Sequence, residues 1–202
     1  MWVRGAAIRP VPPHAVVDAS ILARVERELA DDTESARGEL DEAFARFERT
    51  QPQLAERIAA VLGRPLDETA LALGYFLSIA IWLAFEHTFS DRLAEVTEDE
   101  LRATEASIAL EEELRASHGD EPFDLDDVVS IEQPGVLAFV HEHVDSALDV
   151  VARAQGGDGD EREVDVDDVH AVYRAILVLT LALSHAVSPL DGGARRSAEL
   201  QA

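Results

Sequence analysis

The chain has 202 residues, 47% of them hydrophobic and 29% charged, which is enough for one domain with a substantial core. Forty-one Asp and Glu residues against seventeen Arg give a formal net charge of -24, which argues against nucleic acids and anionic membranes as partners. The chain has no Cys, which excludes disulfides, thiolate metal sites and a cysteine nucleophile.

The acidity has two explanations, and the sequence leaves both open. Lys and Asn are both absent, as expected from a GC-rich genome, while an acidic surface without Lys also suits a salt-rich cytoplasm that screens charge repulsion. In either case the charge serves solubility first, and a partner attracted by it is basic. The first 18 residues contain no apolar segment long enough for a secretory signal, so we expect a cytoplasmic protein.

The chain begins with a proline-rich stretch and ends with a polar one. Residues 1–17 include Pro10, Pro12 and Pro13 and predict an extended N-terminal arm. Residues 191–202 predict a polar C-terminal tail, which leaves a single helical domain over residues 18–190. No run with strand periodicity is bounded by hairpin turns, so strands are not expected.

Amphipathic helices are predicted in the first third of the domain. The first is expected after a cap at Asp18 or Ser20, because positions 21, 22, 25 and 29 are apolar and share one helical face. A second helix is expected over residues 33–50. A third begins with Pro52 in its first turn and stops at Gly63.

Further helices are predicted in the second half. Thr97 and Glu100 have the spacing of a capping box before a helix that ends at Gly119. Residues 120–133 are turn-rich, with room for one short helix, and Pro134 begins a helix that ends near residue 155. The Gly- and Asp-rich stretch that follows superficially resembles a calcium loop, but Arg162 and Val169 occupy positions at which the EF-hand pattern fails.

Two segments, about residues 66–89 and 168–187, are strongly apolar. Residues 69–85 are seventeen consecutive uncharged positions, which as a helix would span about 26 Å, the lower edge for a bilayer. Asp67, Glu68 and Glu86 flank them, and no clustered Arg is present to orient a membrane span. We therefore expect both segments to be the central helices of a bundle and no membrane to be involved.

The predicted architecture is an all-α, single-domain bundle of about six or seven helices. The two apolar helices pack together, and the amphipathic helices wrap them with one stripe turned inward. Their apolar surface exceeds what short neighbours cover easily, so a homodimer through part of it is an alternative to the monomer.

The motifs of common enzyme classes are missing. The sequence has no Gly-rich phosphate loop, no Gly-x-Ser-x-Gly elbow and no basic cluster for nucleotide phosphates. The leading hypothesis is a non-enzymatic acidic helical protein that acts through protein–protein interaction or self-association. It implies no catalytic residue and no cofactor, and its partner is another protein or a second copy of the chain.

The alternative hypothesis is a metal-binding enzyme or carrier with a transition metal inside the bundle. Helical metal sites use inward Glu and His side chains from several helices, and the candidates here are Glu86, His87, His141, Asp145 and His170. Against it, the di-iron pattern of Glu-x-x-His on two helices is absent, and so is the His-Glu-x-x-His zinc pattern.

Three His residues have an Asp four positions later. The pairs are His14–Asp18, His87–Asp91 and His141–Asp145. On a helix this spacing allows contact between an imidazolium and a carboxylate. The pairs therefore predict an assembly that is sensitive to pH between about 5 and 7.

Overall fold

The computed structural model describes residues 7–30, 33–118, 133–154 and 166–190. Within these ranges the chain forms seven α-helices and no strand, which confirms the predicted all-α bundle. The helices are α1 (Ala19–Leu29), α2 (Glu34–Thr50), α3 (Pro52–Leu62), α4 (Glu68–Phe89), α5 (Glu98–His118), α7 (Pro134–Ala154) and α8 (Val166–Ala186), with short 3-10 turns at Pro13–Ala15 and Ser90–Arg92.

α4 and α8 form the centre of the molecule, as predicted for the two apolar segments. Both are long and apolar enough to cross a membrane by length and composition, but 67% of each apolar window is buried inside the protein. In α4 the fully buried side chains include Trp82 and Phe85, and in α8 they include Leu179 and Leu183. Gly74 of α4 lies close to both α3 and α8, because an added Cβ would clash with Leu62 and lie 3.3 Å from Val172.

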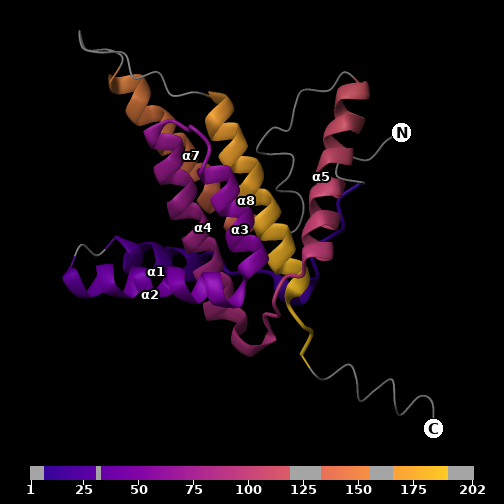
Figure 1. Cartoon of the computed structure of the whole chain (residues 1–202), viewed down its shortest axis with the longest axis horizontal. Coiled ribbons are helices and arrows are strands. Elements are labelled where there is room, and N and C mark those ends of the chain that lie inside the picture. The colour runs from indigo at the N-terminus through magenta and orange to yellow at the C-terminus, as the bar shows by residue number, and fades with distance from the viewer. Residues whose placement is uncertain (1–6, 31–32, 119–132, 155–165, 191–202) are drawn as a thin grey trace.

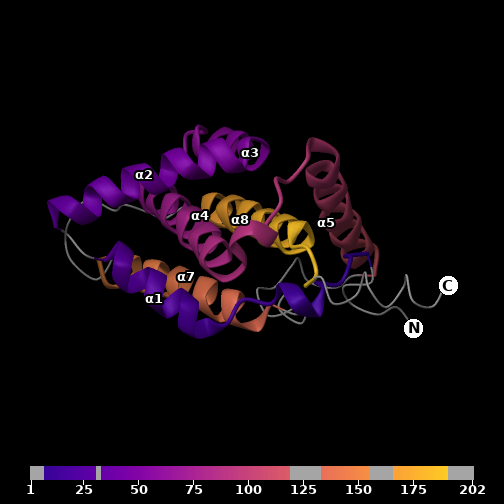
Figure 2. The same cartoon turned by 90° about the horizontal axis from the view of Figure 1, so that it is seen from below.

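The other helices are arranged in layers around this pair. Seen from below, α4 and α8 lie between α2 and α3 on one side and α1 and α7 on the other, with α5 at the end (Figure 2). Figure 1 shows α1 and α2 lying across the lower part of α4, while α3, α7 and α8 run alongside it. α1 and α2 therefore cover the lower part of α4 and leave its N-terminal half less covered.

Several helix ends lie where local signals predict them. The Asp18 carboxylate accepts a hydrogen bond from the Ser20 amide at the start of α1. At α5 the Thr97 amide donates to Glu100 at 2.9 Å and the Glu100 amide donates to the Thr97 hydroxyl at 3.3 Å, which is the predicted capping box. The expected short helix within 120–133 and most of the stretch that resembles a calcium loop lie outside the described residues.

The segment that precedes α1 is packed against the bundle. Ile8, Val11, Ala15 and Val17 are all buried and belong to the hydrophobic core. The Gln133 side chain accepts a hydrogen bond from the Val17 amide at 3.0 Å. Residues 7–17 of the predicted arm therefore contribute to the core, while residues 1–6 and the predicted tail, 191–202, lie outside the described residues.

Candidate functional site

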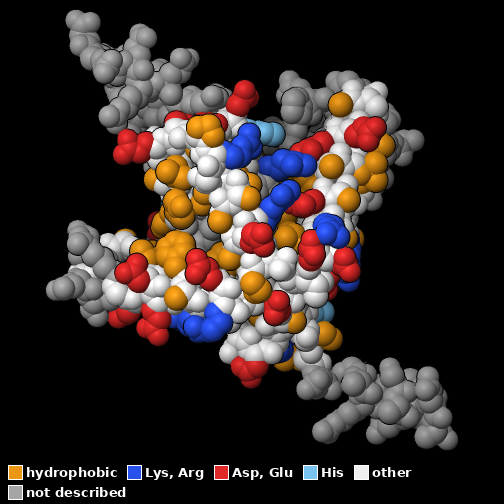
Figure 3. Space-filling view, viewed as in Figure 1, with side chains coloured by type: hydrophobic (Ala, Val, Ile, Leu, Met, Phe, Trp, Pro, Cys, Tyr) orange, Lys and Arg blue, Asp and Glu red, His pale blue; other side chains and the backbone are white. Residues whose placement is uncertain are grey.

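A hollow lined by hydrophobic side chains lies where the tips of α1 and α2 meet the outer face of α4. It has a volume of about 240 Å³ and is lined by Leu29 of α1, Leu40 and Phe44 of α2, and Ala72, Tyr75, Phe76 and Ile79 of α4. Among the described residues, no charged side chain lines this apolar hollow. Figure 3 shows hydrophobic side chains gathered above α2 at this junction.

The position of the apolar hollow follows from how the helices cross. The α4 residues that line it recur every three or four positions, so they form one stripe of the helix. Further along the same stripe, Leu83 is buried where α1 and α2 pack on α4. Beyond that crossing, no helix of the described part of the chain covers this stripe of α4, and Tyr75 is 49% exposed.

Aromatic contacts hold the walls of the apolar hollow in place. The Phe44 and Tyr75 rings meet edge to face with centroids 6.3 Å apart. Behind the wall, the Phe76 ring lies 6.0 Å from Phe139 and 4.8 Å from the imidazole of His143, both on α7. Because such ring pairs add to the burial energy, the hollow is a formed feature of the surface.

Acidic side chains lie on α2 and α4 next to residues that line the apolar hollow. Asp41 and Glu48 are exposed and lie seven residues apart on α2, so they share a face beside that of Leu40 and Phe44. Glu68, also exposed, lies one turn before Ala72 on α4. Figure 3 shows acidic side chains along α2 next to the hydrophobic patch. We call Asp41, Glu48 and Glu68 the acidic rim.

A second hollow lies on the other side of the α1–α2 tip and is polar. It has a volume of about 170 Å³, shares Leu29 and Leu40 with the apolar hollow, and is also lined by Glu28, Glu39, Glu42, Ala43, Arg46, Leu83 and His87. Three of these residues are Glu, in keeping with the acidity of the chain.

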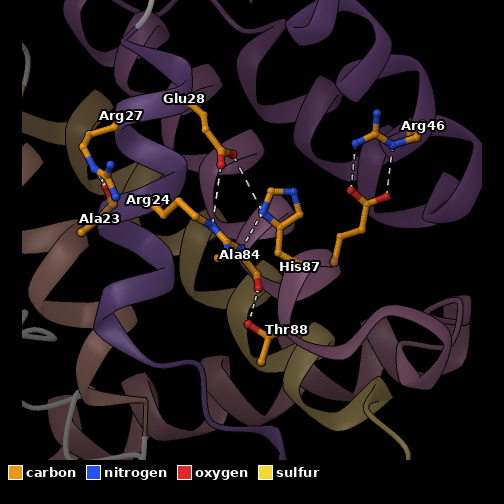
Figure 4. A network of polar contacts seen from close by, with 9 residues as sticks. Ala23, Arg24, Arg27, Glu28, Arg46, Ala84, His87 and Thr88 are labelled. Carbon is orange, nitrogen blue, oxygen red and sulfur yellow. Dashed lines mark hydrogen bonds and ion pairs between the residues drawn. The ribbon is translucent and has the colours of Figure 1, made fainter.

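His87, one of the predicted metal ligands, lines this polar hollow, and its chain neighbour Glu86 pairs with Arg46, which also lines it. Arg46 donates to both oxygens of Glu86, at 3.1 and 2.9 Å, and this pairing raises the pKa of Arg46. His87 Nδ1 lies 3.4 Å from Arg24 Nη2 and 3.9 Å from Glu28 Oε2 (Figure 4). Positive guanidinium groups in this arrangement favour an ion-pair network that joins α1, α2 and α4.

The other predicted ligands lie elsewhere. His141 is half-buried on α7, Asp145 is exposed one turn later, and His170 is exposed in the first turns of α8. The structure therefore brings Glu86 and His87 together as chain neighbours and does not gather the five residues. Among the described residues, no group of three or more His, Asp and Glu side chains is placed to hold a metal ion. Metal binding stays a prediction that elemental analysis of the purified protein can test.

Two of the three His–Asp pairs, His14–Asp18 and His87–Asp91, do not lie within one helix, and their side chains have other partners. His14 Nε2 lies 3.1 Å from the Val187 carbonyl, while Asp18 caps α1. Asp91 lies beyond the end of α4 and accepts a hydrogen bond from Ser90. His14 thus has a long-range partner, Asp18 caps a helix and Asp91 bonds its chain neighbour, in place of the expected helical pairing.

Sequence reasoning missed the apolar hollow and one buried carboxylate. Glu111 of α5 has 0% exposure, and one of its oxygens accepts a hydrogen bond from the Ala7 amide at 3.2 Å. Residues 111–113 are all Glu, and only its position on the helix distinguishes the buried Glu111 from the exposed Glu113.

Comparison with protein-family models, curated protein sequences and solved structures gives no match for this chain.

Proposed function

We propose that this chain is a non-enzymatic protein that acts by binding another protein, and that the apolar hollow is its docking site. The observation that carries the proposal is the half-exposed Tyr75 within a lining of seven hydrophobic residues. Exposed apolar patches on a charged surface are typical of sites for protein interaction. Aromatic side chains such as Tyr and Phe are also enriched at the centres of such interfaces.

The size of the apolar hollow favours side chains of a partner over a small molecule. Pockets for small ligands typically have volumes of about 300–1,000 Å³ and bury most of the ligand, whereas this one has about 240 Å³. Its described lining also lacks the convergent charged groups that orient substrates and cofactors. Glu86 and His87, which were predicted as metal ligands, do not line the apolar hollow and are engaged with Arg46 and Arg24.

The test is a pair of substitutions with matched exposure. Tyr75 and Leu110 are both 49% exposed, but Leu110 lies on α5, away from the apolar hollow. Partners are recovered by crosslinking from the source cells with the native chain, Tyr75→Glu and Leu110→Glu. We expect Tyr75→Glu to lose the partner by at least about tenfold because it places a charge in an apolar contact. Leu110→Glu should retain it.

Light scattering on the same three proteins separates a different protein from a second copy. A dimer that dissociates in Tyr75→Glu and persists in Leu110→Glu would make self-association the function of the apolar hollow. If neither recovery of a partner nor mass depends on position 75, while the unfolding temperatures stay equal, the proposal is wrong.

A further inference from the structure

We infer that the apolar hollow takes an amphipathic helix of a partner protein, with Lys or Arg flanking its apolar stripe. This inference rests on the proposed function and names the class of its partner. Two properties of the site carry it, the length of the apolar stripe on α4 and the charge of the acidic rim.

The lining of α4 matches the repeat of a helix. Ala72, Tyr75 or Phe76, and Ile79 are anchor points over seven residues, or about 10 Å along the axis. A partner helix that presents apolar residues at i, i+3 or i+4, and i+7 spans the same length, which is the usual way a helix binds a groove. A partner strand would need an exposed sheet edge, and the described part of the chain contains no strand.

The acidic rim selects the charge of the partner. Asp41 and Glu48 lie on α2, Glu68 lies on α4, and all three are exposed. The described residues of the floor between them carry no charge, and the whole chain has a net charge of -24. Lys or Arg beside an apolar stripe can therefore pair with the rim while the stripe fills the hollow. Complementary charges of this kind set specificity and speed association.

The same charges disfavour a second copy of the chain as the occupant. A two-fold contact brings the same patch of both subunits together. Each acidic rim would then face the rim of its partner, and like charges across an interface cost free energy. A basic helix meets the same rim with attraction.

The test uses two synthetic helical peptides of about 18 residues, or five turns. Both have Leu at the i, i+3/i+4 and i+7 positions, and the flanking positions are Lys in one peptide and Glu in its twin. Fluorescence anisotropy reports the Kd of each labelled peptide with the full chain. We expect the Lys peptide to bind at least about tenfold more tightly than the Glu peptide at 0.1 M NaCl. The difference should shrink at 1 M, where the Debye length falls from about 10 Å to about 3 Å.

Substitutions locate the binding and separate its two parts. Tyr75→Ser removes an anchor and should weaken the Lys peptide several-fold at every salt concentration, whereas Leu110→Ser on α5 should leave its Kd unchanged. Asp41→Asn, Glu48→Gln and Glu68→Gln together should weaken the Lys peptide at 0.1 M and reduce its dependence on salt. Glu95→Gln, Asp99→Asn and Glu113→Gln together remove the same number of exposed carboxylates at or before α5 and are the matched control for lost charge.

Each outcome has one meaning. If both peptides bind equally well and Tyr75→Ser weakens their binding, the claim that the partner helix is basic is wrong. Docking of a helix at the apolar hollow then still holds. Absence of binding by either peptide, or binding that Tyr75→Ser does not change, overturns the inference. The proposed function is judged separately, by the Tyr75→Glu and Leu110→Glu comparison with native partners.

Discussion

Two buried glutamine side chains hold non-helical segments of the chain against the bundle. Gln133 accepts from the Val17 amide and donates to the Ala15 carbonyl at 2.7 Å and to the Ser184 hydroxyl at 2.9 Å. Gln51 accepts from the Val96 amide at 2.9 Å and donates to the Ala94 carbonyl at 2.9 Å. Each amide supplies the partners that backbone groups outside helices need when they are buried.

Replacing Gln133 with Ala should therefore be costly. The substitution leaves the Val17 amide and the Ala15 carbonyl without these partners, and each buried unsatisfied group costs about 1–3 kcal/mol. We expect the free energy of unfolding, measured by urea denaturation, to fall by at least about 2 kcal/mol. The partly exposed Gln53→Ala is the control and should change it by less than about 0.5 kcal/mol. Equal effects of the two variants would contradict this account.

His185 connects the end of α8 to the segment before α1. Its Nε2–H donates to the Pro10 carbonyl at 3.2 Å. Burial lowers the pKa of His185, and the nearby Arg9 lowers it further, against the opposing effects of the Pro10 hydrogen bond and the Glu100 carboxylate. The neutral imidazole is thus the form that suits the folded protein.

The lowered pKa gives a predicted dependence of stability on pH. The unfolded chain binds a proton at His185 more readily than the folded one. The contribution of His185 to the stability of the folded protein is therefore complete well above pH 6.5. It is lost as the pH falls through the lowered pKa. His185→Asn keeps a donor for Pro10 and has no proton to gain. Between pH 8 and pH 5, the unfolding temperature of the native chain should fall further than that of the variant. Parallel curves would contradict the assignment.

Residue-level features were predictable where they depend on neighbours in the chain. Asp18 as a cap and Thr97 with Glu100 as a capping box are signals within four residues, and the structure has both. The glutamine contacts were not predictable, because Gln133 and Val17 are 116 positions apart and buried glutamines have no local signature.

At the scale of elements, a close approach occurs where α7 begins beside the start of α1. A Cβ on Gly135 would lie 3.0 Å from the Val17 carbonyl oxygen and 3.1 Å from the Ala19 nitrogen, and both of these atoms belong to the backbone. At Gly38, within α2, a Cβ would meet nothing within 4 Å.

Alanine substitutions at these two glycines should have opposite effects. Gly135→Ala should lower the free energy of unfolding by about 1–3 kcal/mol, because backbone atoms cannot move aside as a flexible side chain can. Gly38→Ala should raise it by up to about 1 kcal/mol, since Ala is the better helix former and the site is open. Thermal unfolding of both variants checks this. A stabilising Gly135→Ala would mean that α1 and α7 are less tightly joined than described.

The helices could be predicted because their apolar spacing and end signals are local. The residue ranges 66–89 and 168–187 differ from α4 and α8 by at most two positions at either end. The crossing of α1 and α2 over α4 could not be predicted, since it depends on contacts such as Arg46 with Glu86, 40 positions apart. Tyr75 is exposed only because of where that crossing lies, so the sequence alone marks it as one more residue of an apolar run.

At the scale of the whole molecule, the net charge of -24 opposes compaction. We expect the unfolding temperature to rise as NaCl increases from about 0.05 M to about 1 M, because salt screens the repulsion. A variant with Glu95, Glu113 and Glu142 changed to Gln should respond less, since all three are exposed and carry part of that charge. A salt response that is flat, or equal in the two proteins, would show that repulsion does not limit stability.

Among the described helices, α5 packs mainly on α8 and α3, and its Glu111 also binds the amide of Ala7. The ion pairs Arg57–Glu105 and Arg174–Glu112 join α5 to α3 and α8. Both pairs are partly exposed, so each contributes little to stability. α4, by contrast, contacts helices on several sides. Native-state hydrogen exchange should therefore find that amides of α5 open at a lower free energy than those of α4. Such local unfolding would leave the hollow beside Tyr75 assembled, so detachment of α5 at one end of the molecule need not interrupt the proposed binding at the other.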